Sequence, residues 1–369
     1  MNAMRPGLPT PLIDLMGARW SMGAPVSGAA WFGTGDSAAF GLADGTLAIA
    51  RARWDGEARI QPRDGGGIEL VPASEQPPPV MRIGVHAGPC LSVAGAGGTM
   101  LSGGADGRFA GIGADGTVTT LARFADIRID HVAAATEGIW ACASGSRVHR
   151  FGTIPGVLDL GGAVTALVFH PAGRQLAIAH SDGVTLWDPG APPRHLAGID
   201  LRALTWSADG QYLVGGAPGM AQGWRLPDGE AIALGACAGL PLSSYSHSGG
   251  FFATSGHARV VCWRLSAGAA VVSECGVGSA VAVTHVACHP RRQVIAAGYE
   301  NGAVLLCQPD SAEILFVRAA GGGAVTTLTW SGDGSFLALG AAGGEIGVVA
   351  FPEPLFRADR AAQSGSATQ

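Results

Sequence analysis

The side chains of this chain most able to do chemistry are a few histidines, because imidazole ligates metals and transfers protons near neutral pH. His180 and His257 fall at glycine-containing turns, and His285 begins a predicted strand. A metal site needs three or four such ligands converging on one point, usually with carboxylates nearby. No carboxylate pattern accompanies these histidines, so we expect no metal ligand, no cofactor and no catalytic residue.

Two other motifs resemble chemical sites but have structural explanations. Residues 111–116 match the G-x-G-x-x-G pattern of dinucleotide-binding loops, which requires a helix to begin at the turn. The run that follows, Thr117–Leu121, favours a strand, so we interpret these glycines as a turn between strands. His285, Cys288 and His289 are possible metal ligands, but on a strand Cys288 points away from the two histidines. We therefore expect this segment to be structural.

Composition excludes several classes of function. All 23 basic residues are arginine, which rules out a Schiff-base lysine, a phosphate-loop lysine and a Ser-Lys dyad. No G-x-S-x-G, H-E-x-x-H or calcium-loop motif is present. The formal net charge is −5 and the arginines are scattered, whereas nucleic-acid binders cluster basic residues to neutralise phosphates. We expect no nucleic-acid partner.

The cysteines and the apolar runs indicate a cytoplasmic protein. Seven cysteines make an odd number, none forms a C-x-x-C pair, and four fall inside predicted strands as small apolar residues. Free thiols fit a reducing compartment. No apolar run reaches the ~18 residues of a membrane helix, and residues 1–20 lack the pattern of a secretory signal. We expect no membrane partner.

A repeated unit of short strands must position all of these residues. In the clearest copy, Val164–Phe169 leads through a turn to Gln175–Ala179, which the turn Asp182-Gly183 joins to Val184–Asp188. Alternating apolar and β-branched residues predict half-buried strands. In four more copies, the residue equivalent to Phe169 is followed 13 or 14 positions later by a turn glycine. These pairs are Trp31 and Gly45, Trp206 and Gly219, Cys288 and Gly302, and Trp330 and Gly344.

The period of this repeat is near 40 residues. Successive turn glycines, with Gly256 assigned in the sixth unit, lie 62, 38, 38, 36, 37, 46 and 42 residues apart. The long interval holds an insertion around Asp64–Gly67 and Pro77–Pro79. Units of this length with four short strands cannot bury their own apolar faces, but stacked in a ring they form a β-propeller.

The repeats resemble those of the WD-repeat β-propeller family between about residues 25 and 350. Asp182-Gly183 followed by Trp187-Asp188 is similar to the turn and closing dipeptide of that family, and His170-Pro171 to its first turn. The family's Gly-His dipeptide is not evident, and other units end differently, so its buried polar tetrad should be incomplete. The residues that carry the structural repeat are Asp182, Gly183, Trp187, Trp206, Trp224, Trp263 and Trp330, with the tryptophans packed between blades.

We expect an all-β propeller of eight four-stranded antiparallel blades, with seven as the alternative if one N-terminal unit is an insertion. The last unit lacks a fourth strand after Glu345–Phe351, and Leu12–Trp20 can supply it, which closes the ring and removes an exposed edge. The predicted parts are residues 1–24 as the segment that donates this strand, 25–351 as the propeller and 352–369 as a flexible tail.

The resemblance implies a non-catalytic scaffold that binds a protein or peptide with its rim and channel mouth. In the family, the second turns and the starts of the inner strands share one rim. The candidate contacts there are bulky or polar residues near turns: His180, Arg202, His257, Arg259, His285, Tyr299 and Glu300. The alternative is a metal-assisted hydrolase or lyase at the central channel, in which rim histidines and His131 would converge.

Overall fold

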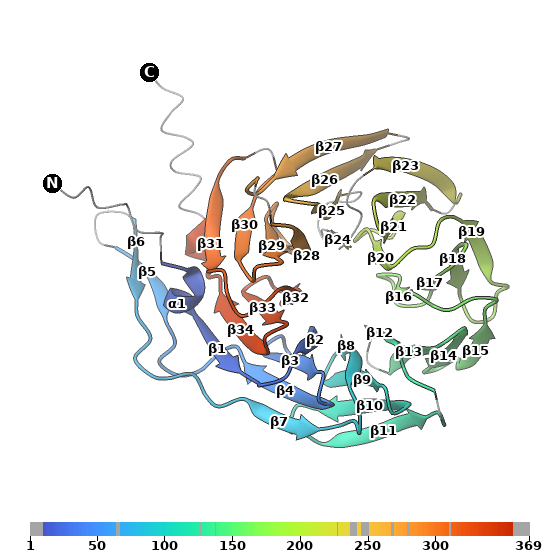
Figure 1. Cartoon of the computed structure of the whole chain (residues 1–369), viewed down its shortest axis with the longest axis horizontal. Helices are drawn as coiled ribbons and strands as arrows, with labels where there is room; N and C mark the ends of the chain where they lie inside the picture. The colour runs from blue at the N-terminus through green and yellow to red at the C-terminus, as the bar shows by residue number, and fades with distance from the viewer. Residues whose placement is uncertain are drawn as a thin grey trace.

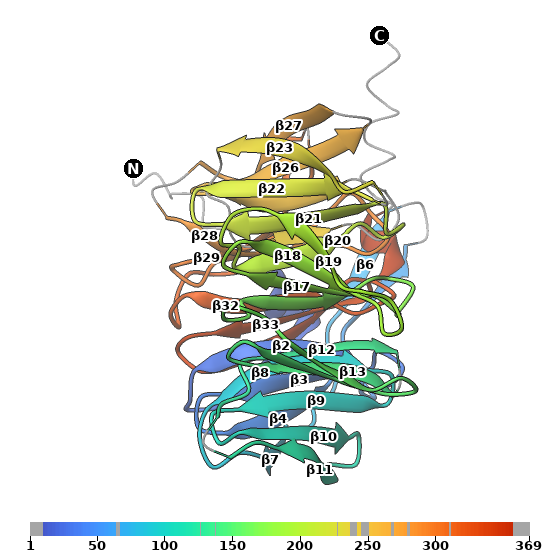
Figure 2. The ribbon, with the colours of Figure 1, turned by 90° about the vertical axis from the view of Figure 1, so that its right-hand side faces the viewer.

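The computed structural model describes residues 10–356 except 64–66, 126, 137, 227, 237–241, 245–250, 267–268, 279–280 and 310. Its main architecture is a ring of eight four-stranded antiparallel sheets around a central axis (Figure 1). Seen from the side, the strands of neighbouring blades cross the thickness of the disc (Figure 2). None of the described helices is long and apolar enough to cross a membrane.

Each blade runs from an innermost strand at the axis to an outermost strand at the circumference. In that order, blades 1 to 4 are β2 (Val26–Phe32), β3 (Ser37–Leu42), β4 (Thr46–Arg51) and β7 (Met81–Gly84); β8 (Cys90–Ala96), β9 (Thr99–Gly104), β10 (Arg108–Gly113) and β11 (Val118–Arg123); β12 (His131–Thr136), β13 (Ile139–Ser144), β14 (Arg147–Phe151) and β15 (Gly156–Asp159); β16 (Ala166–Phe169), β17 (Leu176–His180), β18 (Gly183–Trp187) and β19 (Arg194–Ala197).

The other half of the ring repeats this arrangement. Blades 5 to 8 are β20 (Ala203–Trp206), β21 (Tyr212–Ala217), β22 (Met220–Arg225) and β23 (Glu230–Ala236); β24 (Leu242–Ser244), β25 (Phe251–Gly256), β26 (Arg259–Ser266) and β27 (Ala269–Cys275); β28 (Val283–Cys288), β29 (Ile295–Tyr299), β30 (Val304–Cys307) and β31 (Ile314–Arg318); β32 (Val325–Trp330), β33 (Phe336–Ala341), β34 (Glu345–Ala350) and β1 (Gly17–Ser21).

In blade 4 the two middle strands are buried on both faces, which explains their near-continuous apolar sequences. All five residues of β17 and of β18 are buried, whereas the outermost strand β19 buries only Leu196. The core consists of separate clusters between adjacent blades. The stability of each sheet therefore depends on its neighbours, as in other repeat proteins.

Tryptophans at the ends of inner strands connect successive blades by hydrogen bonds. The indole Nε1–H of Trp206 donates to the Val168 carbonyl at 3.4 Å, and that of Trp330 donates to the Ala287 carbonyl at 3.0 Å. Third-strand tryptophans add packing: Trp187, Trp224 and Trp263 are each buried in a cluster shared with the preceding blade. Each of these side chains thus stabilises an interface between blades.

The ring closes through the N-terminal strand, which confirms the predicted eight blades and their closure. β1 pairs antiparallel with β34, with Trp20 opposite Ile346. A hydrogen bond between innermost strands also joins the first and last blades: the indole Nε1–H of Trp31 in blade 1 donates to the Thr329 carbonyl of blade 8 at 3.0 Å. The closing strand is shorter than the expected Leu12–Trp20, because Leu12–Met16 forms helix α1.

The insertion expected in the long interval is present in blade 1. Between β4 and β7 the chain forms a separate hairpin of β5 (Arg59–Pro62) and β6 (Ile68–Val71). Residues 64–66 of the predicted turn lie outside the described residues. Ile60 and Leu70 of this hairpin pack against the core between blades 7 and 8, so the insertion covers the outside of the ring closure.

Candidate functional site

The turns between second and third strands lie beside the linkers between blades, at one rim that we call the linker rim. Backbone hydrogen bonds join the two, as from Val85 to the Gly45 carbonyl and from Gly198 to the Asp182 carbonyl. Gly45 is required here: its φ is +84°, and a Cβ would stand 2.4 Å from the Gly88 carbonyl oxygen. The rim candidates from the sequence all belong to this region or to the inner strands next to it.

His180 lies inside its blade rather than on the rim surface. Its Nδ1 is 2.5 Å from Asp182 Oδ1, and its Nε2 is 2.9 Å from Thr185 Oγ1. The hydrogen bond with His180 holds the pKa of Asp182 below its usual value. His195 stacks on the same imidazole with ring centroids 5.4 Å apart. His180 therefore has a structural environment within blade 4, and the exposed members of this cluster are Asp182 and His195.

His285 and Arg202 also have intramolecular partners. His285, in the inner strand β28, has Nδ1 2.9 Å from the Val325 carbonyl oxygen of the next blade, and burial lowers its pKa. A neutral imidazole there donates to that carbonyl. Arg202 is exposed near the start of β20, and its Nη2 is 2.5 Å from Asp200 Oδ2. These two residues and His180 lie on three different blades, so the structure does not bring them together.

The other four rim candidates gather at the junction of blades 6 and 7. The Val283 amide donates to the His257 carbonyl at 2.6 Å, and the Glu300 amide donates to the Ala282 carbonyl at 2.9 Å. His257, Arg259 and Glu300 are exposed, whereas Tyr299 is only 3% exposed. The single cluster of candidate contacts is thus a corner of the linker rim.

His257 has an unusual backbone conformation. Among the described residues it is the one non-glycine with positive φ, at +72°. We expected Gly256 to be the turn glycine of this unit, but Gly256 ends β25 and pairs with Arg259, which leaves His257 and Ala258 as the turn. A side chain in this conformation costs about 1–2 kcal/mol. The structure therefore keeps a strained histidine where most other blades have glycine.

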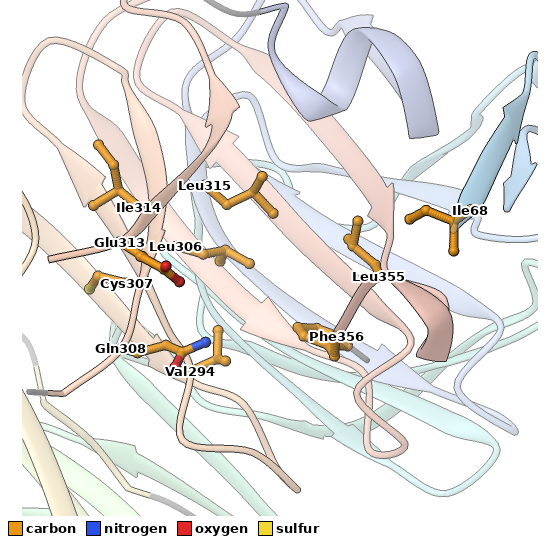
Figure 3. A pocket seen from close by; sticks show the side chains of 10 residues that line it. All are labelled: Ile68, Val294, Leu306, Cys307, Gln308, Glu313, Ile314, Leu315, Leu355 and Phe356. Carbon is orange, nitrogen blue, oxygen red and sulfur yellow. The ribbon is translucent and has the colours of Figure 1, made fainter. Parts of the chain in front are cut away.

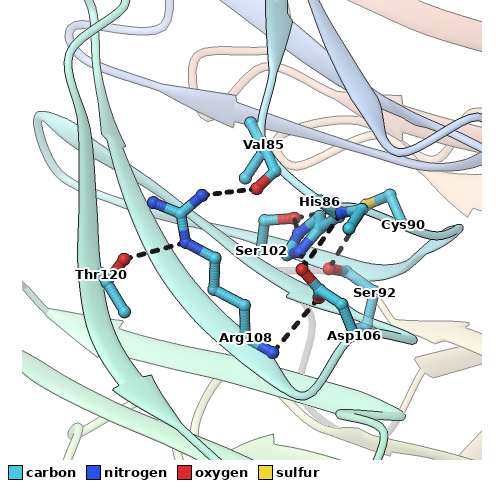
Figure 4. A network of polar contacts seen from close by, with 9 residues as sticks. Val85, His86, Cys90, Ser92, Ser102, Asp106, Arg108 and Thr120 are labelled. Atoms are coloured by element: carbon cyan, nitrogen blue, oxygen red, sulfur yellow. Dashed lines mark hydrogen bonds and ion pairs between the residues drawn. The ribbon is translucent and has the colours of Figure 1, made fainter.

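Sequence analysis missed a polar network in blade 2 that is centred on His86 (Figure 4). His86 lies in the linker before β8, with its side chain fully buried. Its Nδ1 is 3.0 Å from Asp106 Oδ1, and its Nε2 is 2.7 Å from Ser102 Oγ. Asp106 also accepts the backbone amides of Ala87 and Arg108. The signal that could have found His86 is its position 20 residues before Asp106, with strands β8 and β9 between them.

Burial and hydrogen bonding set the protonation states of this network. Burial lowers the pKa of His86, against the opposing effect of Asp106, so the imidazole is neutral. Burial alone would raise the pKa of Asp106, but its bonds from the two amides and His86 outweigh this and lower it. The order Ser102, His86, Asp106 is that of a serine-hydrolase triad. Ser102 is fully buried, however, and no substrate carbonyl can reach its Oγ. The network is therefore structural.

The other chemical motifs have structural environments. The glycines of residues 111–116 end β10 and form the turn to β11, with no helix after them. His289 has Nε2 3.1 Å from the Gly334 carbonyl oxygen and packs edge-on against Trp330. Within the part of the chain that the structure describes, no three His, Cys, Asp or Glu side chains are placed to hold a metal.

An exposed apolar surface lies on the outer edge of blade 7 (Figure 3). Three separate segments meet there around a cavity of about 400 Å³: the hairpin, strand β31 and the turn after β34. Ile68, Ile314 and Leu315 are 40%, 45% and 36% exposed. We call this surface the outer corner and define it by Ile68, Ile314, Leu315, Leu355 and Phe356.

The C-terminal turn is fixed onto the outer corner by Phe356. Its ring packs edge-on against His289 with centroids 5.4 Å apart, and the Arg292 guanidinium lies 4.6 Å above it. Arg292 also forms an ion pair with Glu353. These contacts hold the Phe356 ring in one position at a wall of the cavity, and a side chain that is already held loses less conformational entropy when a partner binds.

Comparison with known proteins shows similarity of fold only. No protein-family model and no curated protein sequence matches the chain. The structure is similar to the crystal structure of the computationally designed Ika8 protein, with a TM-score of 0.65 and 18% sequence identity. The match covers 90% of this chain and 98% of that one. The chain is thus an eight-bladed β-propeller that resembles a designed propeller in its architecture.

Proposed function

We propose that this protein is a non-catalytic interaction platform of the WD-repeat kind, which binds a protein or peptide partner. The observation that supports this most is the outer corner, where Ile68, Ile314 and Leu315 remain exposed beside the Phe356 ring. Exposed apolar surface that several segments build together is typical of interaction sites. Glu313 at its margin favours a partner with an apolar anchor next to a basic residue.

Two features support kinship with WD-repeat propellers. The motif of Asp182, Gly183 and Trp187 occupies the turn and third strand of blade 4. The His86 network places a histidine, an aspartate and a serine in the arrangement of that family's buried polar tetrad, although Val85 replaces the glycine of the family's dipeptide. Family members mostly act as scaffolds, and fold is evidence for function only by analogy. No specific observation favours the metal-assisted alternative.

The test is affinity capture from the native organism with the full chain and two matched variants. Ile68→Glu places a charge in the outer corner, whereas Val157→Glu places one on blade 3 at a residue that is 59% exposed. We expect a stoichiometric partner that is lost with Ile68→Glu and kept with Val157→Glu. A partner that both variants retain, or that both lose, would refute the outer corner as the contact surface.

A further inference from the structure

A second cavity lies between blades 4 and 5, on the rim opposite the linker rim. Its volume of about 350 Å³ is within the range of small-molecule sites. The turn after β16, strands β18 and β19, the turn before β21 and the end of β22 contribute the lining residues that matter here: His170, Gln175, Leu186, Arg194, Gln211 and Leu226. None of the residues that line the cavity is acidic. The lining therefore combines an apolar floor with one cation and two amides.

This cavity and the cavity of the outer corner are built on the same pair of side chains. His170 follows the innermost strand of blade 4 and packs edge-on against Trp206 of blade 5, with ring centroids 4.7 Å apart. His289 and Trp330 repeat this contact between blades 7 and 8, with centroids 4.8 Å apart. The two cavities therefore occupy equivalent positions of the repeat, and what one of them holds indicates what the other can hold.

Between blades 7 and 8, the protein itself fills this position. The Phe356 ring (Figure 3) lies edge-on against His289 with centroids 5.4 Å apart, and it stacks on Phe351 with centroids 6.2 Å apart. The Glu353 carboxylate, from the same turn, pairs with Arg292, whose guanidinium lies over the ring. His289 is only 2% exposed as a result. An aromatic ring with a carboxylate beside it therefore fits this position of the repeat.

Between blades 4 and 5, the equivalent position is open. Within the described part of the chain, Trp206 is the one ring that packs on His170, and His170 stays partly exposed. Leu226 supplies the apolar floor. In strand register, Arg194 of β19 takes the place that Leu315 has in β31. The wall that is apolar in the outer corner thus carries a positive charge here.

The Arg194 guanidinium is exposed and is held at the edge of the cavity. Its Nη2 donates to the backbone carbonyl of Asp228 in blade 5, while the Asp228 carboxylate pairs with Arg225. A guanidinium has five N–H donors and keeps its charge at physiological pH, so Arg194 can bind a carboxylate while it holds this carbonyl. The amides of Gln175 and Gln211 add further donors at the margin.

We propose that this cavity binds a small aromatic monocarboxylate, with the ring against His170 and Leu226 and the carboxylate at Arg194. The ligand takes the place that the Phe356 ring and the Glu353 carboxylate have between blades 7 and 8. This site goes beyond the proposed interaction role and does not depend on it, because none of the residues that define the outer corner lines this cavity.

Isothermal titration calorimetry of the full chain with 3-phenylpropanoate tests the proposal. We expect saturable binding of one molecule per chain, weaker binding of 3-phenylpropan-1-ol and of hexanoate, and no binding of 3-phenylpropylamine. Arg194→Gln should weaken binding about tenfold or more, because it removes hydrogen bonds to a charged group. Arg194→Lys keeps the charge but loses the planar fork, so it should restore part of the affinity. Gln175→Glu places a like charge in the cavity and should also weaken binding.

Matched variants separate loss of the site from loss of the fold. Arg123→Gln removes an exposed arginine from the outermost strand of blade 2 and should bind 3-phenylpropanoate normally. Ile68→Glu should leave this binding intact even if it abolishes partner capture. The melting temperature of each variant shows that it is folded. The proposal is overturned if 3-phenylpropanoate does not saturate, if 3-phenylpropylamine binds as tightly, or if either folded variant, Arg194→Gln or Gln175→Glu, keeps full affinity.

Discussion

Substituting Ile13 in α1 tests how the ring is closed. Ile13 is 2% exposed and belongs to the core cluster between blades 7 and 8. Its Cδ1 packs directly on Gly347 of β34, where a Cβ on that glycine would be only 2.8 Å away. α1 therefore clamps the closing strand against the last blade, and its apolar face carries part of the energy of closure.

Ile13→Ala should lower the free energy of unfolding by about 2–4 kcal/mol, because deleting a buried isoleucine loses transfer energy and leaves a cavity. Leu15→Ala is the matched control, since Leu15 is in the same five-residue helix but is 38% exposed. Leu15→Ala should lower the free energy of unfolding by about 0.5 kcal/mol at most, as surface substitutions usually do. Urea unfolding followed by tryptophan fluorescence measures both variants.

A loss for Ile13→Ala no larger than that for Leu15→Ala would refute this account of closure. The larger perturbation, removal of residues 1–24, takes away β1 and leaves β34 with an unpaired edge. Unpaired edges promote aggregation, so the truncated chain should aggregate or melt at a much lower temperature. A melting temperature that does not change would also contradict the reasoning.

Three further substitutions test individual contacts. Trp330→Phe leaves the buried Ala287 carbonyl without its indole donor and should cost about 1–3 kcal/mol in urea unfolding. Asp106→Asn should destabilise the protein by about 1.5–3 kcal/mol at pH 7. Since the pKa of Asp106 is lowered on folding, its contribution is present above the unfolded pKa of ~3.9 and is lost as pH falls through the folded pKa. The difference between wild type and Asp106→Asn should therefore shrink in acid unfolding titrations. His257→Gly should raise the free energy of unfolding by about 0.5–1 kcal/mol, because glycine tolerates the positive φ of this position. A lower free energy of unfolding would show instead that the imidazole makes a stabilising contact.

The architecture was predictable because the repeat is local and its spacing regular. Anchors such as Trp206 and Trp330 fix where each inner strand ends, and the glycines 13 or 14 residues later fix the second turn. The prediction was less accurate where a turn departs from the glycine rule. We assigned the turn to Gly256, but His257 has the positive φ of this turn, and no local preference indicates a histidine there.

The candidate contacts were harder to predict because exposure depends on neighbours. His180 and His285 are polar residues that sequence alone places at the surface, yet both are largely buried. His180 is hydrogen-bonded to Asp182 within its own blade, and His285 is hydrogen-bonded to the Val325 carbonyl of the next blade. His86 was missed because it lies in a linker 20 residues before Asp106, and only the folded blade brings their side chains together. Leu315 follows an ordinary strand pattern but stays exposed.

The sequence by itself determined a ring of small sheets, since short apolar strands with frequent turns cannot be stable alone and must share their faces. Because the sequence contains no lysine, it also excluded a Schiff-base lysine, a phosphate-loop lysine and a Ser-Lys dyad. Only the tertiary structure decided which polar side chains are satisfied internally and which surfaces stay open. Ile68, Ile314 and Phe356 meet from segments far apart in the chain, and the distance between such segments depends on how eight blades pack around the axis.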